Sequence, residues 1–313
     1  MTAPFRILLP EELDPAAEQR LVAAAEVIRP PATDQPTLCR CIADCDALVS
    51  RTNLRVTRTL LAAGRRLRVV GVAGVGLDNV DVTAADELGI TVVNTPGAAS
   101  DAVAEFAVAL MLQLLRPIPR LHAAYQAGNS RAARETPHGR ELCELTIGIV
   151  GMGRIGTRVG RILSAGCGAR ILYNDIIDVG PFGFPAERAD KLAIWSQSDI
   201  VTLHVPLTPE THGLVNAETL ARFRPGALLI NTARGAIVDT DALVAALRSG
   251  QLAGAALDVT NPEPLPPQHP LFACDNCIIT PHAASRTFGG LRRMFDIVDE
   301  VLAHLAHTAG NQR

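Results

Sequence analysis

The chain has 313 residues, of which 48% are hydrophobic and 19% are charged, so it can bury a sizeable core in one large domain or two ordinary ones. Its formal net charge of −3 gives no electrostatic reason to expect a nucleic-acid partner. Polar residues such as Glu105 and Gln113 interrupt its longest apolar stretch, which argues against a membrane span. The N-terminus does not resemble a signal peptide, and we expect a cytoplasmic protein.

The seven cysteines point to the same compartment. Cys274 and Cys277 form a CxxC pair, but no second pair of ligands follows at a spacing suited to zinc. Disulfides rarely persist in the cytosol. We therefore expect reduced thiols and no metal site.

In the first hundred residues, short apolar runs alternate with helical patterns. The sequence predicts strands at 6–9, 47–50, 67–70 and 91–93, and helices at 15–26, 57–63 and 80–88. Arg51 follows the second strand, and the glycine-rich run 71–79 follows the third. The backbone of that run could bind a carboxylate, or the run could be a turn that needs positive φ; the residues leave both interpretations open.

Residues 98–127 form a long, largely apolar segment with few charges. A helix that is apolar on most sides is buried. We therefore predict one long helix here, packed between domains or against another subunit. The polar stretch 129–141 after it is predicted to be a surface loop.

The segment 145–175 has the pattern strand, glycine turn, helix, strand and acid. We predict strands at 146–150 and 169–173 on either side of a helix at 154–165. In the turn, Gly151 permits a sharp bend, Gly153 lets the backbone approach a pyrophosphate and Gly156 lets the helix pack closely on the strand. Asp175 lies 19 residues beyond Gly156, where a carboxylate would bind the adenosine ribose. This context predicts dinucleotide binding.

The alternation of strands and helices continues to the end of the chain. Further strands are expected at 200–203, 227–230, 254–257 and 277–280, and helices at 240–249 and from 288 to about 304. Such alternation predicts parallel sheets. We therefore expect an α/β protein with two doubly wound, Rossmann-like domains.

Polar side chains that could carry chemistry follow the buried strands of the second half. In open α/β sheets, ligands bind at this carboxyl edge. An arginine can hold a carboxylate through two parallel bonds, and a histidine with a carboxylate partner can transfer a proton near neutral pH. Each residue alone could be structural, but their clustering at successive strand ends favours catalysis. The residues are His204, Arg234, Asp258, Glu263 and His282.

At this point the chain resembles the D-isomer-specific 2-hydroxyacid dehydrogenases over nearly its whole length, and within them the phosphoglycerate dehydrogenase branch. The motifs that carry the resemblance are GVAGVGLDNVD, VNTPGAASDAVAEFAVAL, GIVGMGRIG, LHVPLTPETHGLVN, NTARGAIVDTDALVAAL, GAALDV followed by NPEPLP, and ITPHAAS.

The resemblance implies that an NAD-binding domain, 98–285, is inserted into a split substrate domain, 1–97 plus 286–313. It also implies a homodimer through helix 98–127. Arg234 would bind the substrate's carboxylate and keto oxygen, His282 would donate the proton and Glu263 would hold His282. The remaining cofactor-binding residues would be Arg154, Ile155, His204, Pro206, Thr232, Ala233, Asp258, Ala284 and Val75, and the remaining substrate-binding residues Arg51, Gly74, Val75, Gly76 and Arg134.

The residues after Asp175, one departure from the family pattern and two rival hypotheses bear on the choice of cofactor and substrate. Asp175 is followed by Ile176 and Ile177, with no adjacent arginine, which favours NAD over NADP. Val72 stands where phosphoglycerate dehydrogenases resemble one another in having arginine, which speaks against a phosphorylated substrate. Arg51 and Arg134 could still supply positive charge, so 3-phosphoglycerate stays a candidate substrate. The rival hypotheses are a glyoxylate or hydroxypyruvate reductase that uses NADPH, and a non-catalytic, NAD(H)-sensing protein like the corepressors that resemble this family.

Overall fold

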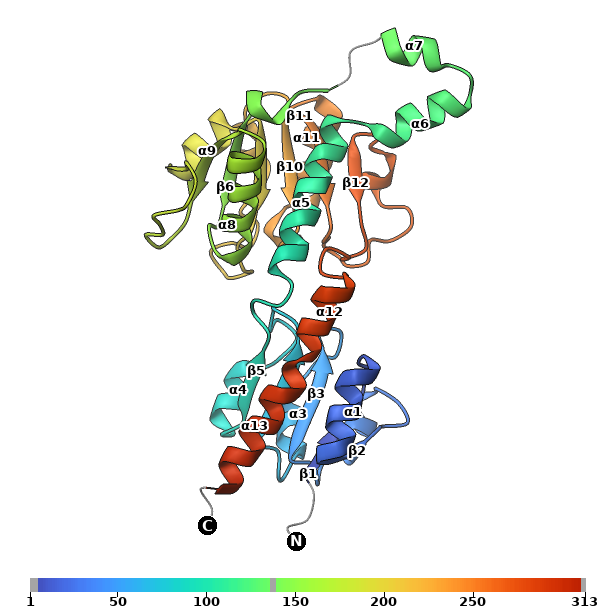
Figure 1. Cartoon of the computed structure of the whole chain (residues 1–313), viewed down its shortest axis with the longest axis vertical. Coiled ribbons are helices and arrows are strands. Elements are labelled where there is room, and N and C mark those ends of the chain that lie inside the picture. Colours follow the sequence, from blue (N-terminus) through green and yellow to red (C-terminus); the bar gives the residue numbers. More distant parts are fainter. Residues whose placement is uncertain (1–4, 136–138, 311–313) are drawn as a thin grey trace. The chain divides into compact units, whose positions relative to one another are not determined.

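The computed structural model describes residues 5–135 and 139–310, and the chain forms two compact units (Figure 1). One unit, here the split unit, comprises Met1–Ala99 and Arg286–Arg313. The other, here the inserted unit, comprises Ser100–Ser285. Each unit has one sheet in which all described strand pairs are parallel, so the prediction of two doubly wound α/β domains is confirmed.

The split unit contains a five-stranded sheet in the order β2-β1-β3-β4-β5. Its strands are β1 (Phe5–Leu8), β2 (Ala25–Ile28), β3 (Ala47–Arg51), β4 (Val69–Ala73) and β5 (Thr91–Asn94). Its helices are α1 (Pro15–Ala24), α2 (Gln35–Ile42), α3 (Arg58–Ala63), α4 (Val82–Glu87), α12 (Phe288–Phe295) and α13 (Ile297–Gly310).

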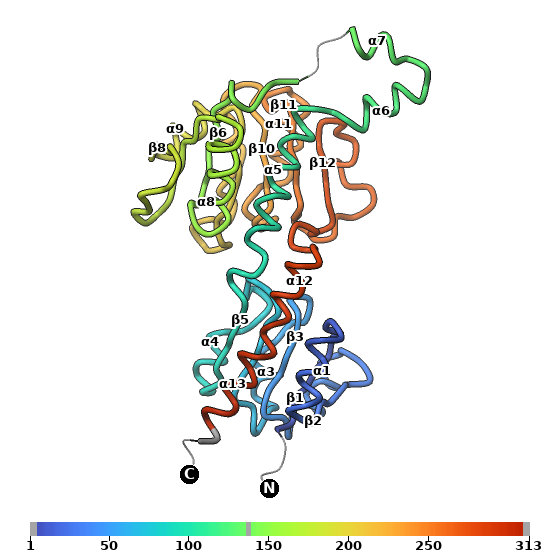
Figure 2. The backbone as a smooth tube through the Cα atoms, viewed as in Figure 1, coloured from blue at the N-terminus to red at the C-terminus, as the bar shows by residue number. Residues whose placement is uncertain are grey.

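Side chains of β4 alternate between two helical layers. Val70 and Val72 pack into a core with side chains of α2, α3 and α4. Gly71, between them, faces α13, and a Cβ at this position would collide with the side chain of Val301. The last helix therefore packs on the sheet of the split unit, as the trace in Figure 2 shows.

Two boundaries in this unit differ from the prediction. The helix predicted at 15–26 ends at Ala24, and the next four residues form the edge strand β2, which sequence reasoning missed. The third predicted strand extends to Ala73, so Gly71 lies within a strand and not in the glycine-rich loop. In both cases strand pairing between distant residues overrides the local pattern.

The inserted unit contains a seven-stranded sheet in the order β12-β11-β10-β9-β6-β7-β8. Its strands are β6 (Thr146–Val150), β7 (Arg170–Asn174), β8 (Glu187–Arg188), β9 (Ile200–Leu203), β10 (Ala227–Asn231), β11 (Leu252–Leu257) and β12 (Cys277–Ile279). Helices α5 (Ser100–Leu115) and α8 (Arg154–Arg161) pack on one face, and α9 (Lys191–Gln197), α10 (Ala217–Ala221) and α11 (Thr240–Ser249) on the other.

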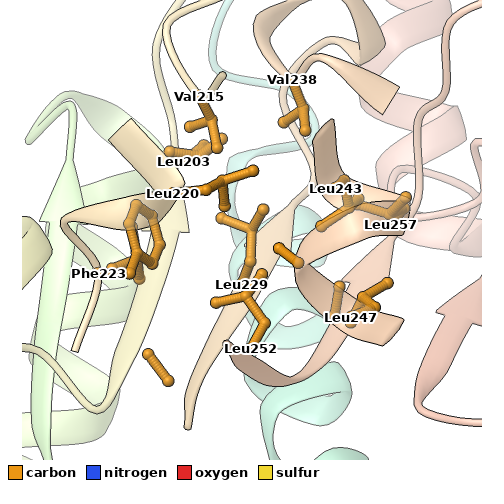
Figure 3. Close-up of a cluster of buried hydrophobic side chains, with 14 of the residues drawn as sticks. Leu203, Val215, Leu220, Phe223, Leu229, Val238, Leu243, Leu247, Leu252 and Leu257 are labelled. Carbon is orange, nitrogen blue, oxygen red and sulfur yellow. The ribbon is translucent and has the colours of Figure 1, made fainter. Parts of the chain in front are cut away.

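The apolar residues of α11 explain how this second face is covered. Leu243 and Leu247, one helical turn apart, meet Leu229 of β10 and Leu257 of β11 in a buried cluster (Figure 3). Asp239 caps the start of α11 by accepting bonds from the N–H groups of residues 241 and 242, and Gly250 ends the helix with a left-handed φ of 78°. The predicted bounds of this helix, 240–249, are confirmed.

The single long helix predicted at 98–127 is wrong. It is two helices, α5 and α6 (Ile118–Gln126), which meet at a bend of 50° beside Pro117. Helix α5 buries one face, but no residue of α6 or of the following α7 (Ser130–Glu135) is buried, although the structure describes both helices in full. Both project from the sheet of the inserted unit (Figure 1).

In the described part of the chain, no single helix is long and apolar enough to cross a membrane. The bent pair of α5 and α6 passes such a test only when the two helices are taken together.

In each sheet, an aspartate at the amino ends of the strands binds the backbone of a neighbouring strand. Asp46, just before β3, accepts a bond from the N–H of Arg6, and Asp199, just before β9, accepts one from the N–H of Thr146. Burial alone raises the pKa of Asp199, but that N–H, Arg140 and Arg224 outweigh it and lower the pKa. Buried carboxylates thus fix strand register at one edge and leave the carboxyl edge to the loops that carry the candidate site.

Candidate active site

The glycine turn between β6 and α8 has the close packing that its glycines predict. Gly151 has φ 92°, and a Cβ there would lie 2.5 Å from the carbonyl oxygen of His204. A Cβ at Gly156 would collide with the carbonyl oxygen of Gly151. Only glycine fits either position without a shift of the backbone.

Gly153 is different, because a Cβ at this position would have no atom of the described residues within 4 Å. Gly153 is also the N-cap of α8, and no described side chain caps this helix. The first N–H groups of α8, on Arg154 and Ile155, therefore have no partner within the helix and no side-chain cap. This arrangement fits the pyrophosphate of a dinucleotide.

Asp175 follows β7, as predicted for a residue that binds ribose. Its Oδ2 accepts a bond of 2.7 Å from the N–H of Met152 in the glycine turn, and its Oδ1 accepts one of 3.2 Å from the N–H of Ile177. The carboxylate thus ties the turn to the next strand. Ile176 is 95% exposed beside it.

The expectation that no arginine lies near Asp175 holds only for its sequence neighbours. Arg188 of β8 places Nη2 3.4 Å from the carbonyl oxygen of Asp175 and 3.3 Å from that of Ile177. Its Nη1 forms an ion pair of 3.0 Å with Asp178. Sequence reasoning missed this arginine because β8 itself was not predicted.

Thr232 supplies a second sign of ligand binding. Its hydroxyl oxygen is buried and finds no partner among the described residues. A buried polar atom without a partner costs about 1–3 kcal/mol. Thr232 follows β10 at the carboxyl edge, beside Ala233, whose N–H is bound by the side chain of Asn231. An orphaned hydroxyl here fits a residue that contacts the nicotinamide end of a dinucleotide.

His204 lies at the end of β9, against the glycine turn. Its Nε2 lies 2.9 Å from the hydroxyl oxygen of Thr202. Burial lowers the pKa of the His204 imidazole from 6.5 to about 3. The ring is therefore neutral at physiological pH and suits a positioning role better than proton transfer. Pro206, two residues later, is exposed.

Backbone hydrogen bonds join the ends of β10, β11 and β12. The N–H of Asp258 donates to the carbonyl of Asn231, and the N–H of Thr280 donates to the carbonyl of Leu257. The loop after β10 also packs on the loop after β11, since a Cβ at Gly235 would collide with the carbonyl oxygen of Thr260. The segments that carry Arg234, Glu263 and His282 are thereby held together.

Glu263 and His282 form the hydrogen-bonded pair that the family resemblance implies. Nδ1 of His282 lies 2.6 Å from Oε1 of Glu263, and the two side chains are 49% and 42% exposed. Oε2 of Glu263 accepts a bond of 3.3 Å from the N–H of Thr260. Because an ionised carboxylate only accepts, Nδ1 carries a proton and Nε2 remains for a substrate.

Arg234 is partly buried at the end of β10. Its Nη1 donates to the carbonyl of Ala233 at 2.7 Å, and its own carbonyl accepts from Nδ2 of Asn231 at 2.9 Å. The bond at Nη1 restricts the guanidinium, whose planar fork suits two-point binding of a carboxylate.

The predicted substrate-side residues Arg51, Gly74, Val75 and Gly76 lie at the carboxyl edge of the split unit. The amide of Asn79 donates to the carbonyl of Arg51, and that of Asn94 donates to the carbonyl of Val75 at 2.7 Å. The loops after β3, β4 and β5 are thus linked. The remaining predicted residue, Arg134, is exposed on α7 of the inserted unit.

Arg286 is a further positive group that sequence reasoning missed. Burial, followed by the positive charge of Arg51, lowers the pKa of its guanidinium. Within residues 5–135 and 139–310, no carboxylate pairs with the guanidinium of either arginine. The carboxylate of Glu11 binds the backbone N–H of Arg51 at 2.7 Å and leaves both guanidinium groups as candidates for an anionic ligand.

These features define an oxidoreductase of the dinucleotide-binding α/β class, with a histidine, a carboxylate and an arginine at one sheet edge. Residues 108–284 match the family model described as D-isomer specific 2-hydroxyacid dehydrogenase, NAD binding domain. The chain belongs to this family.

Individual relatives differ in the substrate that they are named for. A glyoxylate reductase of Thermofilum pendens is 42% identical over 86% of this chain and 80% of its own length. A D-3-phosphoglycerate dehydrogenase of Synechocystis is 37% identical over 90% of this chain, which spans 50% of that relative.

Among solved structures, an NADPH-dependent glyoxylate/hydroxypyruvate reductase from Sinorhizobium meliloti, in complex with NADP and malonate, has a TM-score of 0.85 and 32% identity. The match covers 96% of this chain and 93% of that one.

Proposed function

We propose that the protein interconverts a small D-2-hydroxy acid and its 2-oxo acid, with NAD as the hydride carrier. The observation that carries the proposal is the 2.6 Å bond between His282 and Glu263, on loops packed against the segment of Arg234. Carbonyl reduction needs a proton donor and a group that stabilises negative charge on oxygen, and these residues provide both.

Each residue has a separate task. NADH, when bound, supplies the hydride. Arg234 holds the substrate's carboxylate and stabilises the charge that grows on the keto oxygen. His282, protonated, gives the Nε2 proton to that oxygen, and Glu263 stabilises the imidazolium. In the reverse direction, His282 accepts the proton of the hydroxyl group.

The cofactor-binding residues are part of the proposal. Gly151, Gly153 and Gly156 shape the turn for the pyrophosphate, and Asp175 disfavours the 2′-phosphate of NADP by charge repulsion. The exposed Arg188 could offset part of that repulsion. Steady-state kinetics should give a higher kcat/KM with NADH than with NADPH; the opposite order would support the NADPH-dependent reductase.

We propose that the substrate is a small 2-oxo acid. Whether this acid also carries a phosphate, in addition to its carboxylate, can be tested. Val72 lies fully buried in the core of the split unit, so this position offers no cation. Arg51 and Arg286 each offer a positive charge that could bind a phosphate. If they bind a phosphate, Arg51→Gln and Arg286→Gln should each raise KM for phosphohydroxypyruvate more than for hydroxypyruvate; an equal effect on both acids would assign the two arginines another role.

We also propose that the protein is a cytoplasmic homodimer. All seven cysteines are free, which fits a reducing compartment. Ile118 and Tyr125 of α6 are 66% and 73% exposed, and Leu112 of α5 is 42% exposed, so these helices offer apolar surface to a second copy. Light scattering should give the mass of a dimer, and Tyr125→Lys should lower it; a wild-type monomer would contradict this.

Replacement of His282 tests the proposed reaction. His282→Ala should abolish reduction of glyoxylate, hydroxypyruvate and phosphohydroxypyruvate while NADH still quenches protein fluorescence. Unchanged turnover would refute the assignment. If the wild-type protein binds NADH tightly but reduces none of these acids, the result would instead favour an NAD(H) sensor.

A further inference from the structure

The segment 280–284, which carries His282, wraps around the carboxylate of Asp258. Asp258 is 1% exposed, at the end of β11. Its Oδ1 accepts bonds from the hydroxyl of Thr280 at 2.6 Å and from the N–H of Ala283 at 2.8 Å, and its Oδ2 accepts one from the N–H of Ala284 at 2.8 Å. The N–H of His282 donates to the backbone carbonyl of Asp258 at 2.8 Å.

His282 has a left-handed backbone, with φ 55°. It is the one non-glycine residue with positive φ among the described residues. Non-glycine residues rarely adopt this backbone conformation, and those that do so cluster at functional sites. A left-handed residue turns the N–H groups that follow it toward a common point, which forms a concavity for an anion.

These two observations explain each other. The left-handed His282 directs the N–H groups of Ala283 and Ala284 onto the two oxygens of Asp258. The carboxylate, in turn, holds the residue in a conformation that it would otherwise leave. The backbone from which the imidazole projects is therefore determined by an acid that need not touch the ring.

We propose that Asp258 is a positioning residue for proton transfer: through Thr280, Ala283 and Ala284 it holds His282 where its ring can bind Glu263 and reach the substrate. The proposal rests on the proposed function of His282. It differs from the nicotinamide contact implied by the resemblance, because the effect of Asp258 passes through the backbone of residues 280–284.

Two variants test the proposal, and a third serves as the control. Asp258→Asn keeps the shape, but its amide nitrogen must face one of the N–H donors or the Thr280 hydroxyl. Thr280→Val removes one bond to Oδ1 and leaves Asp258 in place. Asp190→Asn is the matched control, because Asp190 caps α9 by accepting one bond from the N–H of Ala193 and plays no part in this loop.

The first readout needs neither cofactor nor substrate. In the free protein, hydrogen exchange at the amides of residues 282–284 should be faster in Asp258→Asn and Thr280→Val than in wild type, and unchanged in Asp190→Asn. Unaltered protection in both Asp258→Asn and Thr280→Val would overturn the proposal. Thr280→Val keeps the test valid if Asp258→Asn does not fold.

The second readout separates positioning from cofactor contact. A displaced imidazole should lower kcat about 100-fold in Asp258→Asn and about tenfold in Thr280→Val. The solvent deuterium isotope effect should rise in both, and the Kd of NADH should stay within about threefold of the wild-type value. A weaker Kd for NADH in Asp258→Asn with normal kcat in Thr280→Val would assign Asp258 to the nicotinamide. If the wild-type protein reduces no 2-oxo acid, the proposed function fails. The exchange measurement still shows whether Asp258 holds residues 280–284 in place.

Discussion

Two glycines of the turn between β6 and α8 allow the folding role of the turn to be separated from its cofactor role. A Cβ at Gly156 would collide with the carbonyl oxygen of Gly151 and lie 3.2 Å from the side chain of Ile149. A Cβ at Gly153 would meet no described atom within 4 Å, and its φ of −74° suits alanine. The same one-carbon change therefore acts on packing at one position and on the ligand space at the other.

The structure sets the size of each effect. Overpacking costs about 1–3 kcal/mol, so Gly156→Ala should destabilise the protein by that amount. In a unit of this size, about 2–4 °C of melting temperature is lost per kcal/mol. Gly153→Ala should cost less than about 1 kcal/mol, the scale of a changed N-cap. Its Cβ should instead displace the pyrophosphate and weaken NADH binding at least about tenfold, or 1.4 kcal/mol.

Thermal unfolding of the free protein and titration with NADH check both effects. Gly153→Ala should melt close to wild type and bind NADH poorly, whereas Gly156→Ala should melt earlier. The reasoning would be refuted if Gly153→Ala bound NADH with wild-type affinity, since the open space beside Gly153 would then not be the pyrophosphate site.

Three further predictions concern other parts of the inserted unit. Arg234→Lys keeps the charge but loses the planar fork, so kcat/KM should fall about 100-fold or more with the Kd of NADH unchanged; a smaller loss would argue against two-point binding. Because burial lowers the pKa of His204 to about 3, the unfolded chain takes up a proton between pH 6.5 and 3 that the folded chain does not, and stability falls as the pH drops. His204→Gln should remove this part of the acid sensitivity. If the free energy of unfolding fell equally with pH in the wild type and in the variant, the prediction would be contradicted. Burial also raises the pKa of the Cys277 thiol to about 12, so iodoacetamide at pH 8 should label the exposed Cys143 first, as peptide mapping would show.

Sequence reasoning succeeded where function depends on residues close together in the chain. The strand, glycine turn and helix from Thr146 onward were predicted because periodicity and turn glycines are local signals. The pairing of His282 with Glu263 was expected from the family resemblance. The rule that parallel strands end at one edge predicted only that both residues lie at the same edge of the sheet.

Sequence reasoning failed where a contact depends on an element or a backbone conformation that no local pattern indicates. Arg188 reaches the loop of Asp175 through the short strand β8. Burial, followed by the positive charge of Arg51, lowers the pKa of Arg286. Neither arginine has a local signal in the sequence. The hydrogen bonds from residues 280–284 to Asp258 depend on the left-handed φ of His282, which cannot be predicted from the residue type. The helix break at Pro117 did have a signal, since proline inside a helical pattern commonly ends the helix.

The most direct test of the proposed function follows the hydride itself. The protein would be mixed with hydroxypyruvate and NADH deuterated at C4 of the nicotinamide, and the glycerate formed would be analysed by mass spectrometry and chiral chromatography. We expect one deuterium at C2 of D-glycerate when the transferred C4 position is labelled, and none with His282→Ala, which should form no product. L-glycerate, or a product without deuterium from either C4 position, would contradict direct transfer by a D-isomer-specific dehydrogenase.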